Sequence, residues 1–529
     1  MPNRSADPLF QLICSLHKAE KRNFKLYITR SSSKEDLKVV QLFDALDKMK
    51  EYDEAALLKR LPVIKKQQLS NLKAHLYKQI LASLRLLRNE DSIDIQLHEQ
   101  LDYARILYNK GLYIQSLKLL DKIKEQANYY NQDSFLIQVI SLEKKIETLH
   151  ITRSMEDRAD RLSAEAIEVN ERRQAITRLS NLALQLYSWY IKNGHARNEK
   201  DEEGIRKFFK KKMPPDAHLQ TGFYQRLYYC QCYTWYAFIR QDFLMYYRYT
   251  QKWVSLFHEF RQMIPIETPH YIKGLHNLLN AHFDLRNDLG FENAIKELEE
   301  LSNSPAGTQN DNYRIQIFVY LNTARINRHF MQGSFKQGLA LVPFIEDKLQ
   351  EYALYLDRHR VLIFYYKIAS LYFGSGDYNK AIDYLQKIIN WNVDLRNDLQ
   401  SYARLLHMLA HYELGNYDII EHLIKSVYRF MAKMENLTVI EEEMFKFIRT
   451  NFYLSARKIK PEFEKLLQKI KNLEHNRFET RAFAYLDIIS WLESKVYDKP
   501  MATIIREKYE ARKKRTYHQP PAAKATSSH

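Results

Sequence analysis

His407 and His411 are the residues whose types and spacing most directly suggest chemistry. They stand one helical turn apart in the segment HMLAH, a spacing that allows two imidazole rings to hold one metal ion. The HExxH pattern of zinc peptidases has a glutamate after the first histidine to activate water, whereas Met408 stands at that place here. Because a catalytic zinc ion also needs a third protein ligand and none is evident nearby, we interpret the pair as ordinary helix histidines.

The three cysteines, Cys14, Cys230 and Cys232, do not have the spacing of a metal site. Residues two apart on a helix point to different faces, and a zinc site would need a second pair of ligands that the sequence does not supply. We therefore expect Cys230 and Cys232 to be buried thiols in an aromatic-rich helical segment. Three cysteines cannot form a disulfide framework, which fits a reducing compartment.

A basic stretch near the start of the sequence is a candidate for binding phosphates. Between Lys59 and Arg88 there are eight basic residues and no acid. At 3.6 residues per turn, five of them fall on one flank beside a leucine-rich stripe: Lys66, Lys73, Lys78, Arg85 and Arg88. Such a flank can contact nucleic acid or an acidic partner. The alternative is a solvated face, balanced by nearby acids such as Glu90, Asp91 and Asp94.

A second candidate surface combines aromatic rings with basic side chains. The cluster RKFFKKKMPP (206–215) precedes a stretch of forty residues, 221–260, of which fifteen are aromatic. Arginine and lysine are interleaved with these rings at Arg226, Arg240, Arg248 and Lys252, a mixture that can stack nucleobases. The rings have helical spacing on several faces, which favours packing between neighbouring helices.

The motifs that usually mark an enzyme do not occur. The sequence contains no GxxxxGK[ST] phosphate loop, no GxGxxG after a strand and no GxSxG elbow. We therefore predict a protein without catalytic activity and without a cofactor or metal ion.

The elements that position these residues are predicted to be helices. Average usage would give about 37 glycines and about 26 prolines in a chain of this length, but 529 residues here include 12 glycines and 13 prolines. This shortage of turn-forming residues predicts long helices with short connections.

Lys and Arg number 81 against 64 Asp and Glu, a net charge of +17 that suggests acidic partners. The start lacks the pattern of a secretory signal and nowhere do eighteen apolar residues run together, so we expect a soluble, cytoplasmic protein without a membrane partner.

A helical hairpin is clearest in SLYFGSGDYNKAIDYLQKI, residues 370–388. Tyr365, Ile368, Ala369 and Tyr372 recur at spacings of three and four, as on one apolar helical face. Gly376 can take the left-handed conformation that ends a helix, and Asp377 can cap the next one. A second apolar stripe then passes through Ala381, Leu385 and Ile388, with small Ala381 where the two helices would cross.

This unit resembles the tetratricopeptide repeat, whose hairpins carry small and aromatic residues at these places. The pattern recurs in ARILYNKGLYIQSLKLLDKI, LGFENAIKELEEL, MQGSFKQGLALVPFI and LAHYELGNYDIIEHLI. The crossing positions 294, 338, 381 and 420 are 44, 43 and 39 residues apart, whereas a standard repeat takes about 34. With the front segment, the degenerate repeats also look similar to uncharacterised bacterial helical-repeat proteins.

The resemblance implies an all-α protein, an α-solenoid of stacked helical hairpins preceded by an N-terminal helical segment. First helices of such hairpins line a partner-binding surface, and their outward residues here would include Asn327, Tyr366, Ser370 and Tyr412. The implied function is an adaptor or scaffold for an unidentified protein or peptide, and the basic surplus suggests that this partner is acidic. A nucleic-acid-binding or regulatory protein that uses the basic front helices, and a self-assembling structural protein, are the alternatives.

The predicted organisation has three parts. Residues 1–90 form a basic helical segment, 91–510 the repeat array and 511–529 a disordered tail, because the last residues are polar, contain proline and are poor in apolar side chains. Turn signals divide the first part into four predicted helices: Pro8–Thr29, Glu35–Lys50, Asp53–Leu61 and Lys66–Arg88.

Overall fold

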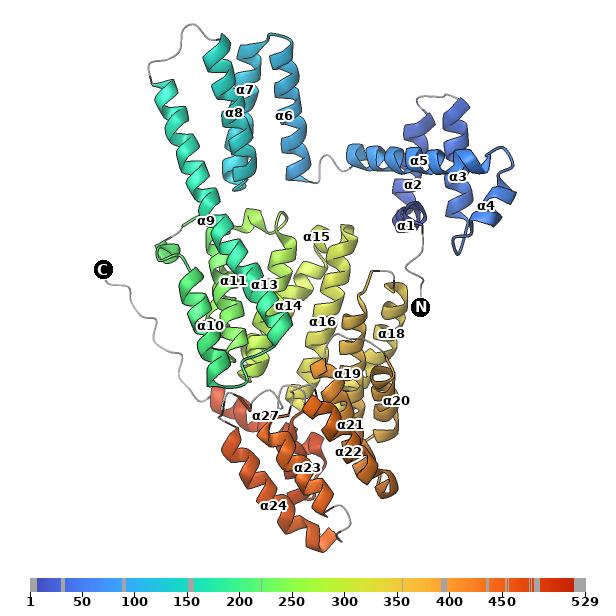
Figure 1. The fold of residues 1–529 in the computed structure, drawn as a ribbon, viewed down its shortest axis with the longest axis vertical. Coiled ribbons are helices and arrows are strands. Elements are labelled where there is room, and N and C mark those ends of the chain that lie inside the picture. The colour runs from blue at the N-terminus through green and yellow to red at the C-terminus, as the bar shows by residue number, and fades with distance from the viewer. Residues whose placement is uncertain are drawn as a thin grey trace. The chain divides into compact units, whose positions relative to one another are not determined.

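A computed structural model shows how these segments fold. It describes residues 7–29, 34–87, 92–150, 157–219, 221–353, 355–391, 397–433, 437–451, 454, 456–474, 476, 478–479 and 486–517. Within these ranges every regular element is a helix, as the sequence predicts (Figure 1). The chain forms two compact units, Met1–Arg173 and Gln174–His529. No helix in the described ranges combines the length and the apolar character that crossing a membrane requires.

The first unit contains two separate hydrophobic cores. Its helices are α1 (Pro8–Ser15), α2 (Lys18–Thr29), α3 (Lys34–Asp47), α4 (Glu54–Arg60), α5 (Lys66–Leu87), α6 (Ile93–Asn109), α7 (Tyr113–Tyr129), α8 (Asp133–His150) and the first part of α9 (Arg158–Asn193). One core joins α1 to α5, and the other joins α6 to α9. Figure 1 shows α6, α7 and α8 side by side. The predicted division near residue 90 falls between these cores, whereas the boundary between the compact units follows Arg173.

The predicted helix Pro8–Thr29 is in fact two helices. Leu16 leaves the helical region with φ −75° and ψ 133°. The backbone N–H of His17 then donates a hydrogen bond of 2.9 Å to Glu20 Oε2, which satisfies an amide that the start of α2 leaves without a helical partner. The break therefore depends on a side-chain cap and not on glycine or proline.

The second unit is a succession of helices in which neighbours along the chain pack on each other. After the remainder of α9 come α10 (Glu199–Lys212), α11 (Phe223–Ile239), α12 (Phe243–Glu259), α13 (Thr268–Asp284), α14 (Asp288–Ser302), α15 (Pro305–Gln309), α16 (Asp311–Gln332), α17 (Phe335–Gly338), α18 (Val342–Glu351), α19 (Arg358–Ser375), α20 (Tyr378–Ile389), α21 (Asn397–Glu413), α22 (Tyr417–Lys433), α23 (Val439–Asn451), α24 (Ala456–Leu473), α26 (Ile488–Val496) and α27 (Met501–Tyr517). Short 3-10 turns lie at 217–219, 261–263 and 339–341.

The hairpin of α19 and α20 has the predicted turn. Gly376 ends α19 with φ 89°, in the left-handed region that favours glycine. The Asp377 carboxylate accepts a hydrogen bond from the backbone N–H of Lys380 and so caps α20. Ala381 is fully buried where α20 packs on α19. The small residue thus lies on the buried face of α20, and its place at the helix crossing stays a prediction.

The predicted start of the disordered tail, residue 511, is too early in the chain. Residues 511–517 belong to α27, which returns to pack on α16 and α19, and residues 518–529 lie outside the described ranges. Arg512 anchors this helix, because its guanidinium lies 3.6 Å from Asp288 Oδ2 and donates a hydrogen bond to the Met331 carbonyl. Contacts with residues far earlier in the chain therefore order a segment whose composition is polar.

Candidate functional site

A cavity of about 230 Å³ lies in the second unit, where α13, α16 and α19 approach α21, α26 and α27. Most of its wall is apolar and comes from segments far apart in the sequence: Phe283, Phe330, Phe335, Ile363, Phe373, Leu399, Leu486, Met501 and Ile505. Six polar or charged residues complete the lining: Arg286, Asn327, Tyr366, Lys367, Ser370 and Asp487. A mainly apolar wall with a few polar groups is typical of a ligand-binding cavity.

Close packing of α17 on α19 shapes one side of this cavity. Gly374 on α19 has no side chain, and a Cβ atom built there would lie 2.3 Å from Cδ1 of Phe335. The ring of Phe335 therefore lies directly against the backbone of α19. Its centroid is 6.0 Å from that of Phe330, so two rings contributed by α16 and α17 stand together in the wall.

Lys367 brings a positive charge into this apolar wall. Its Nζ donates a hydrogen bond of 2.6 Å to Asn327 Oδ1 and lies 5.5 Å from the centroid of Phe330. Within the described residues, no carboxylate forms an ion pair with this ammonium group. Burial lowers the pKa of Lys367 to about 8, because the charged form is poorly solvated there.

Three of the four residues predicted to bind a partner meet at this cavity. Asn327 is the partner of Lys367, while Tyr366 and Ser370 line the cavity one turn apart on α19. The Ser370 hydroxyl donates a hydrogen bond of 2.9 Å to the Tyr366 carbonyl. Tyr412 is not among the lining residues. It is buried on α21 with its ring near that of Trp491 on α26. Asn327 and Tyr366 are buried as well, so the expectation that these three side chains face outward is wrong.

Arg286 places a second cation in the wall from the turn between α13 and α14. Its φ is 53°, in the left-handed region that a residue with a side chain adopts at some energetic cost. The guanidinium lies 5.1 Å from the ring centroid of Phe283. A glycine would suit this turn better, as Gly376 does after α19, so the turn itself does not require arginine.

Further cationic groups surround the ring of Tyr320 on α16. The His276 ring stacks on it with a centroid distance of 4.0 Å, and Lys273 Nζ and the Arg360 guanidinium lie 5.5 and 5.9 Å from its centroid. Burial and the positive charges of Lys273, Lys367 and Arg360 hold the pKa of His276 well below its usual range. We call Lys273, Arg360 and Lys367 the basic face.

The basic flank of the front helices is only partly available for binding. Lys66 and Lys78 are exposed on α5. Lys73 is instead a structural residue, since its ammonium group pairs with Asp7, donates a hydrogen bond of 2.8 Å to the Tyr52 hydroxyl and lies over the Tyr52 ring. Arg85 lies 4.0 Å from Asp102 Oδ2, and Arg88 lies outside the described residues. Of the four predicted residues that the structure describes, Lys73 is therefore not available for binding, whereas the exposed pair of Arg85 neutralises little of its charge.

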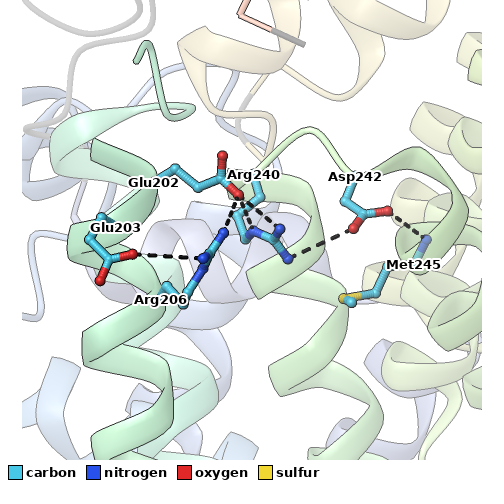
Figure 2. A network of polar contacts seen from close by, with 6 residues as sticks. All are labelled: Glu202, Glu203, Arg206, Arg240, Asp242 and Met245. Atoms are coloured by element: carbon cyan, nitrogen blue, oxygen red, sulfur yellow. Dashed lines mark hydrogen bonds and ion pairs between the residues drawn. The ribbon is translucent and has the colours of Figure 1, made fainter. Parts of the chain in front are cut away.

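Arginines of the aromatic stretch are also paired with acids. Arg240 donates from Nε and one terminal nitrogen to Glu202 Oε1, at 3.0 and 2.8 Å. Figure 2 shows that Arg206 also points at Glu202 and that Asp242 lies beside Arg240. Glu202 is buried on α10, so this network joins α10 to the turn between α11 and α12. Arg226 likewise forms two hydrogen bonds with the Glu259 carboxylate, whereas Arg248 and Lys252 are exposed.

The thiols and the histidine pair are packing residues in this fold. Cys230 and Cys232 are buried, as predicted, and burial raises the pKa of the Cys230 thiol to about 12. The rings of His407 and His411 meet edge to face at 4.6 Å. Burial lowers the pKa of His407 to about 4. Among the described residues, no group of three or more His, Cys, Asp or Glu side chains is arranged to hold a metal ion.

No family model and no curated protein matches the chain. The cavity and the basic face beside it are therefore the features from which a function can be inferred.

Proposed function

We propose that the chain is a non-enzymatic adaptor that binds an acidic segment of a protein or peptide through the α13, α16 and α19 side of its second unit. The cavity carries this proposal, because Asn327, Tyr366 and Ser370 line it together. The resemblance to tetratricopeptide repeats predicts these residues at a partner-binding surface. A stack of helical hairpins in the manner of an α-solenoid is part of the same proposal.

The charge of this surface supports an acidic partner. Lys273 and Lys367 form no ion pair with a described carboxylate, and Arg360 contacts the exposed Asp357 of its own helix start at 3.4 Å. An exposed ion pair of this kind neutralises little of the positive charge of Arg360. Positive charges that no neighbouring acid balances attract an acidic segment and orient it as it approaches.

Affinity capture with charge-reversed variants tests the adaptor function. The full chain would be used to isolate partners from the cells that make it, and each protein identified by mass spectrometry would be purified and titrated against the variants. We expect the double variant Lys273→Glu/Arg360→Glu to bind a true partner at least about tenfold more weakly, equivalent to about 1.4 kcal/mol or more. A matched control is Lys296→Glu/Lys336→Glu, which reverses two exposed charges of the same unit.

The control must retain wild-type affinity, and its circular dichroism and that of the test variant must match the wild type. Equal binding by the test variant and the control would exclude the basic face as the partner surface. Failure of every purified candidate to bind at a defined stoichiometry would exclude the adaptor function itself.

A further inference from the structure

The ammonium group of Lys367 forms no ion pair with any described carboxylate of the cavity. Its hydrogen bond goes to the neutral amide oxygen of Asn327. Asp487 is the carboxylate among the lining residues, and both of its oxygens are engaged at the start of α26, where they accept hydrogen bonds from the backbone N–H and the hydroxyl of Ser490. These donors are neutral, so Asp487 keeps its negative charge, and Asp284 and Asp288 lie close to Arg286. Lys367 is therefore the cation of the cavity that forms no ion pair with a described carboxylate.

Lys367 as a whole is half-buried, but it contributes to the cavity wall, and a charge removed from water without a partner is unfavourable. The low pKa of Lys367, about 8, has this cause. An anion that enters the cavity would supply the missing charge. The side-chain amide of Asn327 can donate a hydrogen bond to the same anion. Its Oδ1 accepts from Lys367, and its amide nitrogen carries two N–H donors.

The rest of the cavity suits an apolar body of limited size. Its volume of about 230 Å³ is that of a site for a small organic molecule. Phe283, Phe330, Phe335 and Phe373 offer rings from four different helices, and aromatic rings favour a flat aromatic or branched aliphatic group. The wall leaves no room for a folded domain or a helix.

We propose that this cavity binds a small organic carboxylate whose body is aromatic or branched aliphatic, with the carboxylate at Lys367 Nζ and the Asn327 amide. This site lies within the partner-binding surface proposed above, because Asn327, Tyr366 and Ser370 line the same cavity. Met501 and Ile505 belong to α27, and Leu486 precedes α26. Because a ligand in the cavity would touch these residues as well as α16 and α19, its binding would hold α27 against the rest of the unit.

Calorimetric titration of the full chain with 3-phenylpropionate, and with its uncharged analogue 3-phenylpropionamide, tests this site. The two compounds have the same shape, so a difference in affinity reports the charge. We expect the carboxylate to bind at least about tenfold more tightly than the amide, which is about 1.4 kcal/mol. In Lys367→Met this preference should disappear, while in the control Lys296→Met it should remain.

Asn327→Asp is the second variant, and it keeps the proposal testable if Lys367→Met does not fold. It replaces the atom that accepts from Lys367 with a carboxylate oxygen, so the cavity would contain its own anion. We expect this variant to unfold at a higher temperature than the wild type and to lose its preference for the carboxylate.

Three results would overturn the proposal. One is the absence of binding by 3-phenylpropionate at millimolar concentration, and another is equal affinity for the carboxylate and the amide in the wild type. The third is a carboxylate preference that survives in both Lys367→Met and Asn327→Asp, since this would indicate an adventitious anion site elsewhere. Partner binding is tested separately, by the Lys273 and Arg360 variants, so failure of one proposal can be distinguished from failure of the other.

Discussion

The environment of Lys367 makes the stability of the second unit depend on pH in a defined window. Its pKa is about 8 in the fold, and an exposed lysine has a pKa of about 10.4. Between these values the unfolded chain binds more protons than the folded chain, so the free energy of unfolding rises as pH increases from about 8 to about 10. Below pH 8 the full cost of burying the ammonium group is present.

Urea unfolding of the wild type and of Lys367→Met at pH 8 and pH 10 measures this effect. We expect the wild type to gain stability relative to the variant over that interval, because methionine fills the site without a charge. The comparison between the two proteins cancels the other groups that titrate at alkaline pH. A constant difference between them at both pH values would contradict the buried-charge explanation.

Gly374 allows a second prediction about a single residue. We expect Gly374→Ala to lower the free energy of unfolding by about 1–3 kcal/mol, as overpacking does, because the new Cβ would lie 2.3 Å from the Phe335 ring. Gly204→Ala is the control. Gly204 lies within α10, and a Cβ atom added there would meet nothing within 4 Å, so alanine should stabilise the helix by about 0.5–1 kcal/mol. Chemical denaturation of both variants measures these changes. An unchanged free energy of unfolding in Gly374→Ala would contradict the close packing of Phe335 on α19.

At the scale of elements, local signals predict the hairpins well. Gly376 and Asp377 determine a turn and a cap through interactions that span only a few residues, and Ala381 is buried as its place in the apolar stripe predicts. The sequence does not reveal the break after α1, because its cap is the Glu20 carboxylate and glutamate is also an ordinary helix residue. Nor does it reveal the end of α27, because Arg512 is held by α14 and α16, which no local pattern shows.

The ion network of Figure 2 joins elements and gives a third prediction. Arg240 is largely buried beside buried Glu202. Replacing Arg240 with methionine leaves that carboxylate without its main partner, and breaking a buried ion pair typically lowers stability by about 3–5 kcal/mol. We expect a large fall in the denaturation midpoint for Arg240→Met. Arg206→Met, which removes an exposed partner of the same carboxylate, should change the midpoint little. Equal effects of the two variants would contradict the role of Arg240 as the main partner of Glu202.

At the scale of the whole molecule, only part of the candidate site could be predicted. Asn327, Tyr366 and Ser370 follow from the resemblance, since they lie on first helices of predicted hairpins. Lys367 and Arg286 do not stand out in the sequence, because a single basic residue on a helix or in a turn usually faces solvent. Their importance depends on walls supplied by residues 486–505, and sequence periodicity does not show which distant helices meet.

The return of α27 to α16 gives the last prediction. Arg512→Ala removes both the contact with Asp288 and the hydrogen bond to the Met331 carbonyl, while Lys514→Ala removes an exposed side chain of the same helix. Hydrogen exchange of the α27 amides should be about fivefold faster in Arg512→Ala than in the wild type, and unchanged in Lys514→Ala. A fivefold change corresponds to a free energy of local opening that is lower by about 1 kcal/mol. Amides of α1 to α5 serve as an internal reference and should be unchanged.

The same exchange measurement connects α27 to the cavity. If the cavity binds a carboxylate, saturating 3-phenylpropionate should slow exchange in α27 of the wild type, because the ligand would contact Met501 and Ile505. In Arg512→Ala the ligand should restore part of the lost protection, since it holds the helix from its apolar side. Unaltered exchange of α27 in Arg512→Ala without ligand would mean that its apolar contacts, such as buried Ile504 and Ile505, suffice to hold the helix in place.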